Sequence, residues 1–182
     1  HASHSPLGAS LERPDGKLRP FHVRLYPYLR LMIDDLYSAQ ILMLAANLPH
    51  AGRLASAHGT GERVAKLCGS KAVVDVTLDP EGKIETFAQD VKACALGQAA
   101  AGVLGQNILG AERSEVLAAR DAMVAMLKSD GPGPDGRFSG LQALRQVKDY
   151  PARHASTLVS IEATLEAIDK ALAERTRLAG AA

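Results

Sequence analysis

Apolar side chains recur at helical spacing where the regular part of the chain begins. Ile33, Leu36, Tyr37, Ile41, Leu44 and Ala45 fall on one face of a helix. Asp34 and Asp35 stand in its first turn, where the helix dipole favours acidic residues. Because Pro49 disfavours helical backbone before it, the helix is expected to end near Asn47. Residues 50–63, rich in Gly, Ala and Ser, are expected to form a loop.

An alternation of apolar and polar residues predicts a hairpin in the next part of the chain. Residues 71–78 are the first strand, 79–82 the turn, and 83–92 the return strand. The apolar phase of the return strand slips between Ile84 and Phe87, which indicates a bulge or an edge position. Residues 64–68 are a candidate third strand.

The remaining sequence has the periodicity of helices. Helices are expected over residues 96–109, 115–128, 141–147 and 153–175, with a Gly- and Pro-rich loop at 131–136. Ser114 is the expected cap of the second of these helices. A block of strands followed by a block of helices predicts an α+β fold, with a small antiparallel three-stranded sheet packed against several helices.

Residues 1–31 differ from this pattern. The segment contains four prolines and five basic residues against two acids. We expect a leader or tag segment that is disordered or poorly packed, with Met32 as a candidate natural start. An organellar presequence is the alternative, which the acids and prolines disfavour. A single domain is expected over residues 32–178, followed by a short tail at 179–182.

Composition narrows the function classes. The net charge is +1, there is no Trp, and only 4% of residues are aromatic, which argues against nucleic acid or an anionic membrane as partner. No apolar run approaches the roughly 20 residues that span a bilayer. Two cysteines do not make a disulfide framework and favour reduced thiols, hence a cytoplasmic protein.

Three residues are candidates for metal chemistry. Cys68 lies in a Gly-containing turn, Cys94 lies where a strand leads into a helix, and His154 lies in the first turn of the last helix. Thiolates at a helix N-terminus are stabilised, and two thiolates with an imidazole suit zinc or iron. Each residue also has a plain structural explanation, since cysteines are often core residues and a surface histidine is often only solvated. Neither Ser70 nor Ser156 shows a partner pattern for nucleophilic catalysis.

The order and context of these segments resemble the NifU/IscU/SufU iron–sulfur cluster assembly scaffolds from about Ile33 to Ala171. The similarity rests on LYSAQILMLAANLPHAGRL, LCGSKAVVDVTLDPEGKI, VKACALGQAAAGVLGQNILG and LQALRQVKDYPARHASTL. It implies a SufU/IscU-like fold. It also implies a site in which Cys68 and Cys94 match the first two cysteines and His154 matches the histidine. Ser70 takes the place of the Asp, and Ala155 that of the third cysteine; a shift of one residue places Ser156 there instead.

The resemblance implies a scaffold or carrier that transiently binds iron or an Fe–S cluster at Cys68, Cys94 and His154. Its partners would be a cysteine desulfurase and recipient apo-proteins or carrier proteins. A zinc-bound sulfurtransferase of the SufU type is the alternative, and a degenerate member that serves as an interaction module is the third. A non-enzymatic scaffold is favoured, but enzymatic activity is left open.

Overall fold

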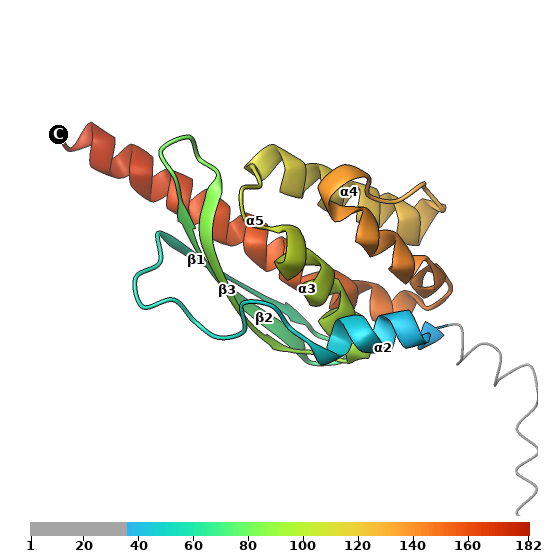
Figure 1. Ribbon diagram of the computed structural model, residues 1–182. Helices are drawn as coiled ribbons and strands as arrows, with labels where there is room; N and C mark the ends of the chain where they lie inside the picture. Colours follow the sequence, from blue (N-terminus) through green and yellow to red (C-terminus); the bar gives the residue numbers. More distant parts are fainter. Residues whose placement is uncertain (1–35) are drawn as a thin grey trace, which may run out of the picture. The chain divides into compact units, whose positions relative to one another are not determined.

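The computed structural model describes residues 36–182. The expected leader over 1–31, and Ile33, Asp34 and Asp35 of the first helix, lie outside the described residues. The elements in chain order are α2 (Ala39–Ala46), β1 (Gly59–Ala65), β2 (Ser70–Leu78), β3 (Ile84–Lys92), α3 (Ala95–Asn107), α4 (Arg113–Ser129), the 3₁₀ helix η1 (Gly136–Asp149) and α5 (Pro151–Gly180). The predicted α+β class is confirmed (Figure 1).

The three strands form one antiparallel sheet in the order β1-β2-β3. The hairpin is confirmed, with Asp79 closing the turn by accepting hydrogen bonds from the backbone N–H groups of Glu81 and Lys83, both at 2.9 Å. The pairing register shifts where Leu78 pairs with Ile84, so Glu85 is left without a partner. The predicted bulge is therefore present, and β3 is also an edge strand.

The third strand lies earlier in the sequence than predicted, over 59–65 and not 64–68. The strand begins at Gly59 and includes Gly61, two glycines whose composition is typical of a loop. These glycines allow α5 to pack directly against β1: a Cβ at Gly59 would lie 2.1 Å from the Ala167 carbonyl oxygen, and one at Gly61 would lie 2.0 Å from that of Ala163. No side chain fits there, so the strand is Gly-rich for a tertiary reason.

The helices form two further layers on the sheet. α5 packs along β1 and β2, α3 packs against α5 and β3, α4 packs against α5 and η1, and η1 also contacts α3 and α5 (Figure 1). Phe138, Leu141, Leu144 and Val147 of η1 are all buried, and their spacing of three residues matches the 3₁₀ period. Within residues 36–182, no helix combines the length and apolar character needed to cross a membrane.

Several helices begin or end at residues other than those predicted. α2 begins at Ala39, because the Ser38 side chain accepts a hydrogen bond from the Ile41 N–H and caps the helix; the predicted start at Ile33 lies outside the described residues. α4 is capped by Glu112 and not by Ser114, through a reciprocal capping box with Glu115. The last helix runs to Gly180, past both the expected helix end near 175 and the expected domain end at 178.

The segment between α2 and β1 is held against the sheet by two buried polar side chains. Gln89 donates from Nε2 to the carbonyl oxygens of Pro49 and Ala101, both at 3.0 Å. The Asp75 carboxylate accepts hydrogen bonds from Arg53 Nε at 2.7 Å, from Thr60 Oγ1 at 2.5 Å and from the backbone N–H of Leu54. Burial raises the pKa of Asp75, but these hydrogen bonds outweigh it, so the net pKa is lowered.

Candidate metal centre

The two cysteines lie just outside the strands, at the same end of the sheet. Lys71 near the start of β2 pairs with Lys92 at the end of β3. Cys68 lies two residues before β2 begins, and Cys94 lies two residues after β3 ends, as the N-cap of α3. The antiparallel pairing therefore brings the two thiols to one end of the sheet.

Cys68 is exposed, in the turn between β1 and β2. Its Sγ donates a hydrogen bond to Ser70 Oγ over 3.1 Å. Hydrogen bonds that the Ser70 side chain and backbone offer to the thiolate lower the pKa of Cys68, and the positive charge of Arg153 acts in the same direction. This thiol is therefore both accessible and activated.

Cys94 is half-buried and faces α5. Its Sγ lies 3.4 Å from Ser156 Oγ, and that hydroxyl donates to the carbonyl oxygen of Arg153 at 3.1 Å. Ser156 is fully buried, whereas the neighbouring Ala155 is exposed. Each of the two thiols is thus paired with one serine hydroxyl.

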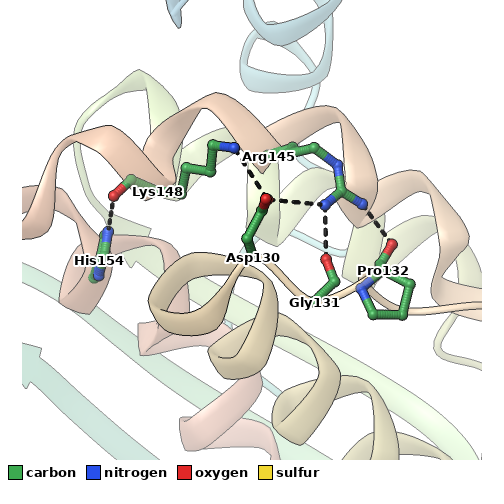
Figure 2. Close-up of polar contacts among 6 residues, drawn as sticks. All are labelled: Asp130, Gly131, Pro132, Arg145, Lys148 and His154. Atoms are coloured by element: carbon green, nitrogen blue, oxygen red, sulfur yellow. Dashed lines mark hydrogen bonds and ion pairs between the residues drawn. The ribbon is translucent and has the colours of Figure 1, made fainter.

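His154 has a structural contact at the junction of η1 and α5. Figure 2 shows its imidazole directed at the end of η1. Nε2 lies 2.9 Å from the carbonyl oxygen of Val147 and 3.2 Å from that of Lys148. Since carbonyl oxygens only accept, Nε2 carries the proton in these contacts.

Asp130 anchors the same end of η1 on its other side. Lys148 Nζ donates to Asp130 Oδ1 at 3.0 Å, and Arg145 donates to the carbonyl oxygen of Gly131 at 2.7 Å (Figure 2). The backbone that His154 contacts is therefore fixed from both directions.

The predicted ligand set is only partly assembled. Within residues 36–182, no three His, Cys, Asp or Glu side chains lie close enough together to hold a metal ion. The donors at this end of the sheet are two thiols and two serine hydroxyls, with one hydroxyl in contact with each thiol. Two thiolates suit a soft or borderline metal and would balance the charge of one divalent cation, so the donor set fits such an ion but leaves positions open.

Two residues that are not among the predicted ligands contact or influence the thiols. Arg153 supplies a positive charge near Cys68, and Ser156 contacts Cys94 although 62 positions separate them. In the sequence, an alignment shifted by one residue places Ser156 at the position of the third cysteine. Choosing that alignment requires knowing which side of α5 faces α3, and the sequence does not show this.

No protein-family model and no curated protein matches the chain. Solved structures do match it. The N-terminal part of a nitrogen-fixing NifU-like protein from Brucella abortus is similar, with 44% identity and a TM-score of 0.75, over 78% of this chain and 98% of that one.

Two more distant structures support the fold alone. A candidate iron–sulfur cluster assembly scaffold for the SUF system from the thermophile Fervidobacterium islandicum AW-1 has 21% identity and a TM-score of 0.67, over 74% of this chain and 98% of its own. A hypothetical protein has 23% identity and a TM-score of 0.66, over 75% of this chain and 98% of its own.

Proposed function

The chain belongs to the NifU/IscU/SufU-type family of iron–sulfur cluster assembly scaffolds, and from this premise we propose that it transiently carries iron or an Fe–S cluster at Cys68 and Cys94. A cysteine desulfurase would supply the sulfur, and recipient apo-proteins or carrier proteins would take the cargo. The observation that carries the proposal is the arrival of both free thiols at one end of the sheet. Free thiols need a reducing compartment, which favours the cytoplasm.

A site with only two thiolates suits transient binding of iron or a cluster, and not its permanent storage. Iron–sulfur clusters are usually held by four thiolates, or by histidines in place of some of them. With Cys68 and Cys94 alone, solvent or a partner protein must fill the remaining positions. Cargo held in this way exchanges readily, which is what a scaffold requires.

His154 remains the proposed third ligand, acting through Nδ1. Metal-bound histidines commonly donate their other ring N–H to a carbonyl oxygen, and Nε2 of His154 already does so with Val147. Because the described structure does not group His154 with the thiols, its ligation requires a shift of the turn that holds Cys68 or of the first turn of α5.

Two exposed apolar side chains near Cys68 offer a partner protein a surface to contact. Leu67, next to Cys68, is 81% exposed, and Val64 at the end of β1 is 50% exposed. Large apolar side chains that are this exposed are common at docking sites when they cluster. We propose that the desulfurase or the recipient approaches Cys68 from this side.

Anaerobic reconstitution with Fe²⁺ and sulfide tests the carrier function. The wild-type protein is expected to develop the visible absorption of an iron–sulfur chromophore, and Cys68→Ser and Cys94→Ser are each expected to reduce it. Ser129→Ala, at the far end of α4, serves as a substitution control. A wild type without chromophore, or one that both cysteine variants reproduce, contradicts the proposal.

The accessible, activated thiol of Cys68 also favours a second function, that of a zinc-bound sulfurtransferase. The Cys68 thiolate would attack the outer sulfur of a desulfurase persulfide. The S–S bond of the donor breaks, a new S–S bond forms on Cys68, and the desulfurase cysteine leaves as thiolate, with no net oxidation. Mass spectrometry after incubation with desulfurase and cysteine would detect one added sulfur on Cys68. Metal content near zero together with no sulfur transfer would instead favour an interaction module.

A further inference from the structure

One face of the three-stranded sheet is covered by helices, and the opposite face has an exposed part (Figure 1). Cβ atoms at Gly59 and Gly61 would meet α5, and Gln89 on the same face donates a hydrogen bond to α3. Because side chains alternate between the two faces of a strand, their neighbours point away from these helices. On that second face the segment of Arg53 lies over Asp75, and the positions nearer the thiols carry exposed side chains.

The exposed part of this face has an acidic row of side chains beside a basic row. The pairing register aligns one residue of each strand in each row. The acidic row is Glu62, Val73 and Asp90, and the basic row, nearer the thiols, is Val64, Lys71 and Lys92. Like charges directly opposite each other, such as Lys71 and Lys92, are destabilising within a sheet. A binding partner that neutralises them would offset this cost.

The charges of the two rows are only partly paired within the chain. Lys71 Nζ lies 3.1 Å from Glu62 Oε1, in a pair whose side chains are both about half exposed. Within residues 36–182, the exposed side chains of Asp90 and Lys92 form no ion pair. The rows also enclose a cavity of 280 Å³, lined by Arg53, Thr60, Val73 and the four charged side chains of the rows.

We propose that these two rows form an interface between two copies of the chain, related by a two-fold axis that runs between the acidic and the basic row. A half-turn about this axis places the acidic row of one copy on the basic row of the other. Lys92 of each copy then faces Asp90 of the other, so the surface is its own charge complement. Sheets packed face to face lie about 10 Å apart, which lets a lysine side chain of one copy enter the cavity of the other.

The dimer has a consequence for the thiols. The half-turn reverses the strand direction, so the two pairs of cysteines lie at opposite ends of the dimer and each copy keeps its own site. Dimerisation itself does not depend on the proposed cargo. Val64, however, belongs both to the basic row and to the surface proposed above for the desulfurase or the recipient. A second copy and a partner protein would therefore compete for this surface.

Sedimentation velocity of the metal-free protein over a range of concentrations, with a chelator present, tests the interface. The wild type is expected to show a reversible monomer–dimer equilibrium that weakens as salt is added. Lys92→Glu and Asp90→Lys each place like charges opposite each other twice, because the interface is symmetric. Each is expected to weaken dimerisation by at least about tenfold. The double variant Asp90→Lys/Lys92→Glu exchanges the signs of the facing residues and is expected to restore most of the affinity.

Lys170→Glu is the matched control for Lys92→Glu. It makes the same charge change at an exposed lysine of α5, on the helix-covered side of the sheet. This variant is expected to dimerise as the wild type does. Thermal unfolding of every variant confirms that the fold is kept.

Each outcome supports or overturns the inference. A wild type that stays monomeric at all concentrations overturns it and leaves the exposed face to a different protein. A dimer that neither single variant weakens lies on another face and also overturns it. Single variants that weaken the dimer without recovery in the double variant show that the two rows do not face each other. Weakening by both single variants with recovery in the double variant supports the inference. The proposed function fails separately, if a protein that dimerises forms no chromophore.

Discussion

The imidazole of His154 and the carbonyl oxygen of Val147 lie 2.9 Å apart, which joins the first turn of α5 to the end of η1. The same ring nitrogen lies 3.2 Å from the Lys148 carbonyl oxygen. A residue selected as a candidate ligand thus has a role in the metal-free fold. Loss of stability and loss of metal binding on its substitution must therefore be measured separately.

We predict that His154→Ala destabilises the metal-free protein by about 1 kcal/mol, because the end of η1 loses its side-chain donor. His154→Gln keeps an N–H donor of similar reach and is expected to lose less. Urea unfolding in the presence of a chelator measures both. Equal stability of the alanine variant and the wild type would show that the contact with Val147 contributes nothing.

The close approach of β1 and α5 gives a second prediction. Gly61→Ala is expected to destabilise the protein by about 3 kcal/mol, because its Cβ would overlap the backbone of α5 at Ala163. Gly180→Ala is the matched control, since nothing lies within 4 Å of a Cβ there. Chemical unfolding of both variants provides the comparison. Similar stabilities would mean that helix and strand can separate without cost.

The parts of the fold with local signals could be predicted from the sequence. The hairpin follows from alternation and from an Asp-Pro-Glu-Gly turn, and the buried stripe of Val116, Ala119, Met123 and Leu127 follows from helical spacing. The bulge could also be predicted, because the alternation of apolar and polar residues shifts between Ile84 and Phe87. Each of these patterns reflects which side chains of one element face the core.

The parts fixed by distant residues could not be predicted. Gly59 and Gly61 are loop-like in composition, and only the packing of α5, about 100 residues later, explains them as strand residues. Ser114 and Glu112 both qualify as caps by residue type or by box spacing, and backbone geometry decides between them. The same holds for the site, where the contact of Ser156 with Cys94 depends on how α5 is rotated against α3.

The buried carboxylate of Asp75 gives a pH-dependent prediction. Its folded-state pKa is lowered, so its hydrogen bonds contribute stability that is fully present above the ordinary carboxyl pKa near 4 and is lost as the pH falls through the folded-state pKa. Asp75→Asn is expected to cost about 2 kcal/mol at neutral pH. Its unfolding free energy should also fall less steeply than that of the wild type as the solution is acidified below about pH 4.

Asp121→Asn is the control for Asp75, because Asp121 is an exposed carboxylate whose ion pair with Arg120 lies at the surface. Such pairs contribute about 0–1 kcal/mol, so this variant should follow the acid profile of the wild type. Thermal unfolding between pH 3 and pH 7 measures all three proteins. Parallel profiles for Asp75→Asn and the wild type would contradict the role of the buried carboxylate.

The two thiols should differ in reactivity before any metal is bound. Cys68 is exposed and has a lowered pKa, whereas Cys94 is half-buried against α5. We predict that iodoacetamide at neutral pH alkylates Cys68 several-fold faster than Cys94, because Cys68 is exposed and hydrogen bonds to its thiolate lower its pKa. Ser70→Ala removes the hydroxyl partner of Cys68 and is expected to slow its alkylation while leaving that of Cys94 unchanged. Time-resolved peptide mass spectrometry follows both sites in one sample. Equal rates at the two cysteines would remove the argument for Cys68 as the entry point for sulfur, although both could still hold iron.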